Sequence, residues 1–184
     1  MTSASSVGGE GRLRLFLALR LPEPVLDAVE SWQRNALAGI RIVPREHLHV
    51  TLAFLGSRPA AELDRIVEAL RAAAADAPPD LRLAASRYRE TRSAAMLVLG
   101  DLDGGATRLA ASVQGRLEAL GAYRREGRPW LPHLTVARFR ERPRLEVEPP
   151  PMGTFVPSDA AAYLSRLHPS GARYEVLESV ALGG

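Results

Sequence analysis

Cysteine and lysine are both absent from this chain of 184 residues. The absence of cysteine excludes a disulfide framework, a thiolate nucleophile and a cysteine metal site. Long apolar runs are missing as well, because the first apolar stretch, 15–19, is only five residues long and ends at Arg20. Such a stretch is too short for a signal peptide or a membrane span. We therefore expect a cytoplasmic protein without a membrane anchor.

The hydrophobic content is that of a folded protein. Hydrophobic residues make up 46% of the chain, which excludes disorder for most of its length. A chain of this size buries about two-thirds of the surface that it exposes when unfolded, enough for one domain with its own core. The first eleven residues are small and polar, so we expect a flexible tail over 1–11 and a single domain over 12–184.

All of the positive charge comes from arginine. The 24 basic residues exceed the 21 acidic ones by three, and seven arginines against two glutamates lie within 124–144. This segment has the charge needed to attract phosphate groups. A solvated, arginine-rich edge explains it equally well, so both interpretations stay open.

Strands and helices alternate in both halves of the sequence. Apolar alternation and apolar runs indicate strands, and apolar residues at helical spacing indicate helices. The proline-rich segment 142–158 is typical of an irregular connection. The predicted strands cover 13–20, 47–55, 81–88, 95–100, 133–140 and 172–180, and the predicted helices begin near Pro24 and cover 60–76 and 106–120. This order favours an α+β protein of two related lobes, divided near the turn at 77–79.

A His-apolar-Thr-apolar pattern occurs twice, at 49–52 and at 133–136. Residues two apart share one face of a strand, so each histidine is expected beside its threonine. In the first strand the same alternation places His47, His49 and Thr51 on one face. It places the apolar residues Leu48, Val50, Leu52 and Phe54 on the other face, toward the core.

Two histidines and two threonines suit phosphodiester chemistry. A neutral imidazole can take a proton from water while a protonated one gives a proton to a leaving oxygen. Both forms of histidine coexist near neutral pH because its unperturbed pKa is about 6.5. Threonine hydroxyls can donate hydrogen bonds to phosphoryl oxygens. With nearby arginines, these residues describe a metal-free phosphodiester site.

The segments HLHVTLAFLG at 47–56 and RPWLPHLTVAR at 128–138 resemble the two signatures of the 2H phosphoesterase superfamily. More narrowly, they are similar to those of the RNA 2′,3′-cyclic phosphodiesterases, also called 2′-5′ RNA ligases. The resemblance extends through RLFLALRLPEPV at 13–25 and YLSRLHPSGARYEVL at 163–177, so it covers nearly the whole chain.

The resemblance implies a bilobal α+β fold, with two pseudo-symmetric lobes of antiparallel sheet, helices outside and a central cleft. It implies hydrolysis of RNA 2′,3′-cyclic phosphate ends to 2′-phosphomonoesters, and the reverse joining of such an end to a 5′-hydroxyl. No metal or other cofactor is implied. We expect RNA with a cyclic phosphate end, or a cyclic nucleotide, as the binding partner of a monomer.

Site roles follow from the resemblance by position. It assigns His49 as proton donor, His133 as proton acceptor, and Thr51 and Thr135 as phosphate contacts. Arg138, five residues after the second histidine, is implied as a further phosphate contact. Strict alternation from His133 puts Arg138 on the opposite face of the strand. The implied contact therefore requires a twist or bulge near Ala137, or a side chain that reaches around the strand edge.

Other residues are open to two interpretations. His47 and His49 form a possible metal pair, but two ligands are too few for a metal site. His168 lies in a turn sequence and is expected at the surface. Trp130 suits stacking on a base and packing equally, whereas packing is favoured for Phe139.

Two other functions remain alternatives. One keeps the chemistry and changes the substrate to a small cyclic nucleotide, which the dependence on RNA length would distinguish. The other is an RNA-binding module that holds the cyclic end without turnover. In that case the motif residues would be needed for affinity only.

Overall fold

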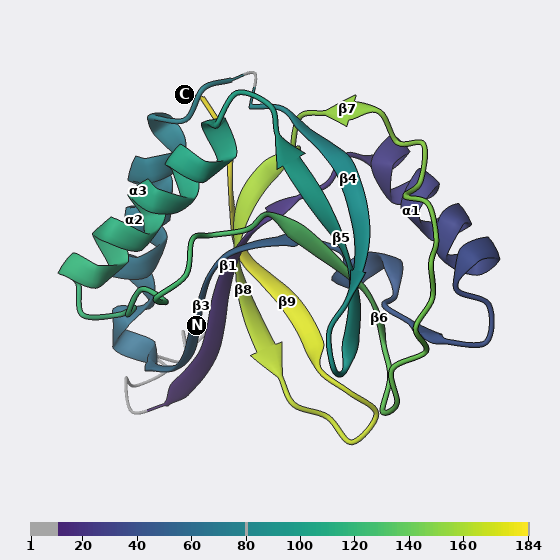
Figure 1. The fold of residues 1–184 in the computed structure, drawn as a ribbon. Helices are drawn as coiled ribbons and strands as arrows, with labels where there is room; N and C mark the ends of the chain where they lie inside the picture. Colours follow the sequence, from purple (N-terminus) through teal and green to yellow (C-terminus); the bar gives the residue numbers. More distant parts are fainter. Residues whose placement is uncertain (1–10, 80, 184) are drawn as a thin grey trace, which may run out of the picture.

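The computed structural model describes residues 11–79 and 81–183, whose strands form one antiparallel sheet with helices packed against it (Figure 1). The first part of the chain contains β1 (Arg12–Arg20), α1 (Glu23–Ala36), β2 (Arg41–Ile42), a 3-10 helix (Arg45–His47), β3 (Val50–Pro59), a second 3-10 helix (Ala60–Glu62) and α2 (Leu63–Ala75). The remainder contains β4 (Leu83–Glu90), β5 (Ala94–Asp101), α3 (Gly105–Ala119), β6 (His133–Arg138), β7 (Thr154–Phe155), β8 (Asp159–Arg166) and β9 (Arg173–Val180).

The sheet has two halves that meet where β3 lies beside β6. The strand order is β7-β4-β5-β6-β3-β1-β8-β9, with β2 paired to β6. We call β3, β1, β8 and β9 the β1 half, and β6, β5, β4, β7 and β2 the β5 half. At the junction, β3 and β6 pair through Val50 and Leu134. Each of these residues is the second of a His-apolar-Thr-apolar pattern, so the sheet order alone brings the two motifs together.

Helices cover each half. The α2 and α3 helices pack on the β1 half, where α2 contacts β8 and β9 and α3 contacts β3. The α1 helix covers the β5 half (Figure 1), with the Trp32 ring 6.1 Å from the Tyr88 ring of β4. The predicted α+β class with antiparallel sheet is confirmed. Among the described residues, no helix is both long and apolar enough to cross a membrane.

The expected division into lobes near 77–79 is wrong, because the two halves of the sheet are not consecutive in sequence. The last strands, β8 and β9, return to pair beside β1. The α1 helix, early in the sequence, covers strands formed much later. The chain thus exchanges segments between the two halves of the sheet. The last strands can join the β1 half because β1 forms hydrogen bonds along both edges, with β3 on one edge and β8 on the other.

The two faces of β1 are buried in different ways. Leu15, Leu17 and Leu19 belong to the main core beneath the helices. Phe16, on the other face, belongs to a smaller cluster with Tyr163, against which Tyr174 packs. The β1 half therefore has an aromatic layer on the side that the helices do not cover.

The predicted tail over 1–11 lies outside the described residues, except for Gly11. The Gly11 carbonyl accepts a hydrogen bond from the backbone N–H of Ala60, at 2.8 Å. Gly11 is thus held at the start of β1.

Candidate active site

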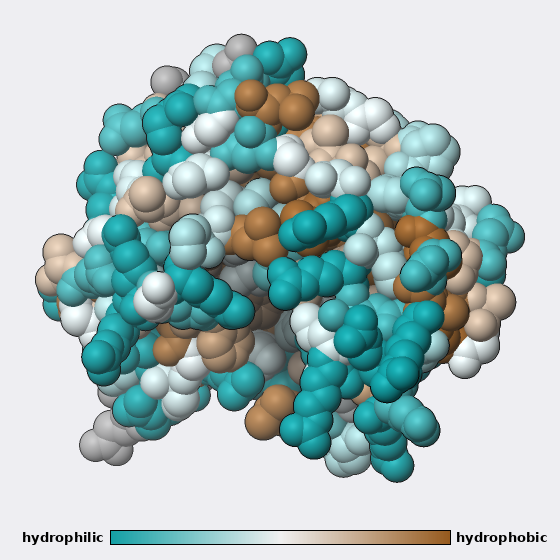
Figure 2. Space-filling model, in the orientation of Figure 1, coloured by the Kyte–Doolittle hydropathy of each residue, from teal (hydrophilic) through white to brown (hydrophobic). Residues whose placement is uncertain are grey.

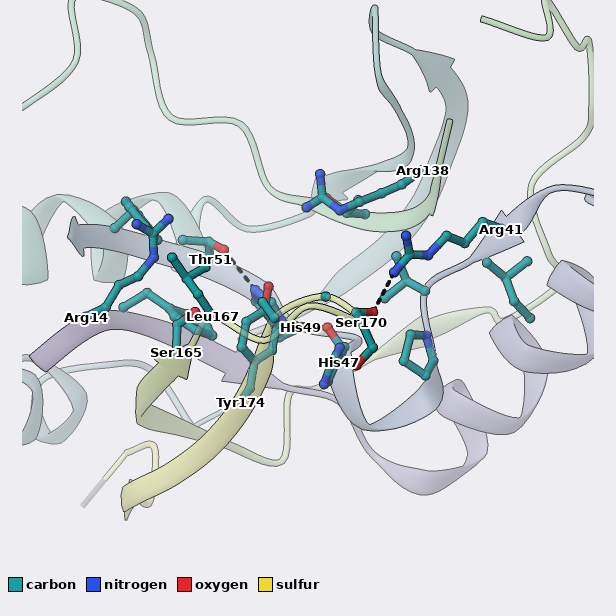
Figure 3. Close-up of a pocket in the computed structure, with 18 residues that line it drawn as sticks. Arg14, Arg41, His47, His49, Thr51, Arg138, Ser165, Leu167, Ser170 and Tyr174 are labelled. Carbon is teal, nitrogen blue, oxygen red and sulfur yellow. Dashed lines mark hydrogen bonds between the residues drawn. The ribbon is translucent and has the colours of Figure 1, made fainter. Parts of the chain in front are cut away.

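A pocket of about 540 Å³ lies where the two halves of the sheet meet. Figure 2 shows the surface hollowed there between hydrophilic side chains. Figure 3 shows His49 and Thr51 from the β1 half and Arg138 of β6 from the β5 half. Thr135 of β6 also lines the pocket. Both threonines predicted to bind phosphate therefore line one pocket.

The first motif begins just before β3. The Nδ1–H of His49 donates a hydrogen bond to the carbonyl of His47, at 2.7 Å. The opposite ring nitrogen, Nε2, lies 3.1 Å from the Thr51 hydroxyl oxygen. A carbonyl can only accept a hydrogen bond, so the proton of the neutral ring is on Nδ1 and Nε2 is the nitrogen available for proton transfer.

The second motif has the same local geometry. The Nδ1–H of His133 donates to the carbonyl of Leu131, at 2.9 Å. In each motif the acceptor is therefore the residue two positions before the histidine. Thr135 lines the pocket, whereas His133 does not. His133 is nevertheless close enough for its positive charge to lower the pKa of His49.

The surroundings of His49 lower its pKa to about 4. Burial is the main cause, because it disfavours the charged imidazolium. The positive charges of His133, His47 and Arg138 act in the same direction, and the hydrogen bond to the His47 carbonyl opposes them. The ring centre of Phe16 lies 4.9 Å from that of His49 and supplies part of the apolar surroundings. His49 is therefore neutral at pH 7 in the free protein.

A β-bulge brings Arg138 into the pocket. Ala95 of β5 pairs with Ala137, and the next residue, Met96, pairs with Thr135, so Val136 is an extra residue in β6. The extra residue reverses the alternation, and Thr135 and Arg138 both line the pocket. Strict alternation in the sequence requires a twist or bulge near Ala137, or a side chain that reaches around the strand edge. The structure contains the bulge.

The prediction that Phe54 is a core residue is wrong. Phe54 is 50% exposed and lines the pocket. The reason is again an irregular register, because β3 pairs with β1 through two shifts that leave Leu52 and Leu55 without partners. Leu52 and Ala53 are both buried, and Phe54 turns to the opposite face. The Arg14 guanidinium lies over its ring, 4.9 Å from the centre.

The structure places Trp130 outside the residues that line the pocket. Its indole N–H donates to the backbone carbonyl of Thr51, at 3.0 Å, and its ring packs against the main core. Phe139 also packs there. His168, expected at the surface, is exposed and its Nδ1 lies 2.8 Å from the Ser170 hydroxyl.

Several pocket residues were not predicted from the sequence. Arg14 and Phe16 line it from β1, and Arg41 and Tyr174 line it from β2 and β9. Figure 3 shows Arg14 beside Thr51 and Arg41 beside Ser170, whose carbonyl accepts a hydrogen bond from the Arg41 guanidinium at 3.1 Å. Arg14 and Phe16 alternate with leucines in the strand at 13–20, and that pattern was the available signal.

The pocket is positively charged. Arg14, Arg41 and Arg138 line it, and no aspartate or glutamate is among the described residues that do so. Such a lining favours an anion. In residues 11–79 and 81–183, no group of three or more His, Cys, Asp or Glu side chains is arranged to hold a metal ion.

Comparisons with known proteins show the family and the fold of this chain. An RNA 2′,3′-cyclic phosphodiesterase of Thermus thermophilus is 35% identical, over 94% of this chain and 91% of its own length. The crystal structure of the Thermus thermophilus protein TT0787 superposes with a TM-score of 0.78, at 29% identity over 94% of this chain and 99% of that one. E. coli LigT in apo form has a TM-score of 0.77 at 24% identity, with the same coverage, and shares the fold. The family model of the 2′-5′ RNA ligase superfamily matches residues 21–169, and the chain belongs to that superfamily.

Proposed function

We propose that the protein hydrolyses RNA 2′,3′-cyclic phosphate ends to 2′-phosphomonoesters. One observation carries this proposal: the two His-apolar-Thr-apolar motifs meet on neighbouring strands, at a pocket lined by three arginines. The activity in the name of the 35% identical Thermus thermophilus relative supports it.

In the proposed reaction, water attacks the phosphorus and the bond from phosphorus to the 3′-oxygen breaks. One imidazole takes the proton of the attacking water, and the other gives a proton to the leaving 3′-oxygen. Thr51 and Thr135 donate hydrogen bonds to the phosphoryl oxygens, and Arg138 offsets their negative charge. A 5′-hydroxyl in place of water gives the joining reaction. No step requires an electron acceptor or a metal ion.

The two histidines have different roles in the proposed proton transfers. We assign His49 as proton donor and His133 as proton acceptor, as the family resemblance implies. Because the pKa of His49 is about 4 in the free protein, a donor at this position must gain its proton as the anionic phosphate binds. A bound anion acts against burial and raises that pKa. The reverse assignment needs no such change in His49.

The pH dependence of kcat/KM reports the groups of the free enzyme, and either assignment requires one proton on the pair of histidines. We expect kcat/KM to fall below about pH 4, where His49 also takes up a proton, and to fall in basic solution, where the pair loses its one proton. A p-nitrophenyl phosphodiester, whose leaving group needs no proton, decides between the assignments. If His49 is the donor, this substrate should restore turnover to His49→Ala and not to His133→Ala, and the reverse result would make His49 the acceptor.

The principal experiment uses a short RNA ending in a 2′,3′-cyclic phosphate, in the presence of EDTA. We expect a 2′-phosphate product from the unaltered protein, and loss of that product in His49→Ala and in His133→Ala. Binding of the cyclic end without turnover would favour the RNA-binding alternative. Turnover that disappears in EDTA would contradict the metal-free mechanism.

A small cyclic nucleotide is the second candidate, because a pocket of about 540 Å³ has room for one nucleotide. The arginines favour RNA, since Arg14 and Arg41 lie on different sides of His49 (Figure 3) and a single cyclic phosphate does not need both. A KM that is lower for an RNA dinucleotide with a cyclic phosphate end than for a cyclic mononucleotide would support RNA as the substrate.

That the protein is a monomer and lies in the cytoplasm stays a prediction.

A further inference from the structure

The chain contains two glutamines, Gln33 in α1 and Gln114 in α3. Both are buried, with 0% and 6% of their surface exposed. Glutamine is mostly a surface residue, and its burial is costly unless its amide is hydrogen-bonded. The two lie beneath opposite halves of the sheet, which points to a related role in each half.

Each glutamine donates to the same position of a motif. The Gln33 amide Nε2 donates to the carbonyl of Val136 at 2.8 Å and to that of Val43 at 2.9 Å. The Gln114 Nε2 donates to the carbonyl of Leu52 at 2.9 Å. Leu52 and Val136 are the fourth residues of the two His-apolar-Thr-apolar motifs.

The same two residues are the extra residues of the β-bulges. Leu52 has no partner in the register of β3 with β1, and Val136 has none in the register of β6 with β5. A bulge disrupts the ladder locally, and a buried carbonyl at that point needs a donor from elsewhere. The Gln114 amide supplies such a donor at Leu52, and the Gln33 amide adds a second donor at Val136, whose carbonyl also accepts from the Val43 backbone N–H at 2.9 Å.

The bulges decide which side chains face the pocket. In β3, Thr51 and Phe54 both line it, and in β6, Thr135 and Arg138 both line it. Each pair is three residues apart, whereas regular alternation would put its two members on opposite faces. The bulge between them is what brings both to the substrate side.

We propose that Gln33 and Gln114 are positioning residues that hold the two bulges and thereby set Thr135 with Arg138, and Thr51 with Phe54, toward the substrate. The proposal uses the proposed function for its activity measurements only. The structure shows the cost of this arrangement at Gln33, whose Oε1 is buried without a hydrogen-bond partner among the described residues. An apolar residue of the same size would avoid that cost, but it would leave the Val136 bulge without the side-chain donor.

The test replaces each glutamine by methionine, which has a similar shape and no donor. Misplacement of a reacting group by about 1 Å can cost on the order of 100-fold in rate, so we expect kcat/KM to fall by about 10-fold to 100-fold in each variant. Val29→Ala in α1 and Val113→Ala in α3 are the matched controls, because both valines are fully buried in the same helices. The controls should lower Tm without changing the kcat/KM of the folded protein.

Crossed double variants separate positioning from a general loss of stability. Arg138→Ala should lower kcat/KM by a smaller factor in the Gln33→Met background than in the unaltered protein. In the Gln114→Met background it should lower kcat/KM by the same factor as in the unaltered protein. Phe54→Ala should show the opposite pattern. Equal effects of Arg138→Ala in all three backgrounds would overturn the proposal for Gln33. If Gln33→Met does not fold, Gln114→Met tests the same idea with the loss of a single hydrogen bond.

A crystal structure of each methionine variant gives a readout that does not depend on activity. We expect the bulge at Val136 or Leu52 to be lost or shifted, with Arg138 or Phe54 displaced from the pocket. Unchanged bulges in both variants would overturn the proposal. If the unaltered protein does not hydrolyse cyclic RNA ends, the proposed function fails, and these structures still decide whether the glutamines hold the strands.

Discussion

His49 shows how one side chain acquires its properties from its surroundings. The His47 carbonyl fixes which ring nitrogen carries the proton, at a distance of 2.7 Å. The aromatic layer on the uncovered face of the β1 half contributes to its burial, with Phe16 and Tyr163 rings 4.9 and 5.9 Å from the imidazole. The result is an imidazole that is neutral over a wider pH range than in water.

This pKa makes the free energy of unfolding depend on pH. The unfolded chain binds a proton at His49 below about pH 6.5, and the folded protein binds it only near pH 4. Stability therefore falls as pH drops from about 6.5 to about 4, by at most about 3 kcal/mol from this residue. Urea unfolding of the unaltered protein and of His49→Asn, across this pH window, measures the difference. Parallel pH dependences in the two proteins would show that the His49 pKa is not lowered.

Phe54 can be tested as a pocket residue rather than a core residue. A buried phenylalanine replaced by alanine costs about 3–5 kcal/mol in stability, but at 50% exposure Phe54 should cost less than about 1 kcal/mol. Stacking of a base on an aromatic ring is worth about 1–3 kcal/mol, so Phe54→Ala should raise KM for RNA by roughly 5-fold to 150-fold. Phe54→Trp is the control that should retain binding. A large loss of stability with unchanged KM would show instead that Phe54 acts as a core residue.

At the scale of elements, alternation in the sequence predicts the strands well where one face is apolar and the other is not. The predicted strand at 13–20 is β1, and the one at 133–140 begins as β6 does. β8 was missed because Ala160–Ala162 have little strand preference. These small residues are buried between β1 and β9, so their place depends on packing that a local pattern does not contain.

The bulges explain why the site was predicted only in part. His49, Thr51 and Thr135 follow from spacing within one strand, and no partner strand is needed to place them. Phe54 was misplaced, and Arg138 was implied only by resemblance, because a bulge depends on the register with the neighbouring strand. Register with a strand far away in the sequence is a tertiary property.

Trp130 connects the segment that leads into β6 with the first motif. Its indole N–H donates to the Thr51 carbonyl at 3.0 Å. Trp130→Phe keeps an aromatic ring and removes that donor, so we expect a stability loss of about 1 kcal/mol and a lower kcat, because Thr51 is less firmly held. Thermal unfolding and steady-state kinetics on the same samples measure both effects. An increase in KM alone would instead indicate that Trp130 contacts the RNA.

At the scale of the whole molecule, the pocket exists because the chain exchanges segments between the two halves of the sheet. β8 and β9 complete the half that begins with β1, and their residues Ser165 and Tyr174 line the pocket beside residues of β3 and β6. The two motifs meet because the sheet order places β3 next to β6. No pattern within either motif specifies that neighbour, and none specifies that β8 and β9 return to pair beside β1, which is why the expected division near 77–79 failed.

The charge distribution of the whole molecule predicts how RNA binding depends on salt. Most of the surface mixes both signs, as in the pairs of Arg71 with Glu68 and Glu178, whereas the pocket contains Arg14, Arg41 and Arg138 without a carboxylate among its described lining residues. Each neutralised phosphate of a single strand contributes about −0.7 to the slope of log K against log salt concentration, so three contacts give a slope of about −2.

Fluorescence anisotropy with a labelled RNA ending in a 2′-phosphate, between about 50 and 200 mM salt, measures this slope. We expect Arg14→Gln and Arg41→Gln each to make it shallower by about 0.7. Arg71→Gln on α2 changes the net charge equally and should leave the slope unchanged, because α2 packs on the opposite side of the sheet from the aromatic layer. If all three variants shift the slope alike, net charge governs binding. If none does, the RNA does not extend along the pocket arginines, and a cyclic mononucleotide becomes the better substrate for this pocket.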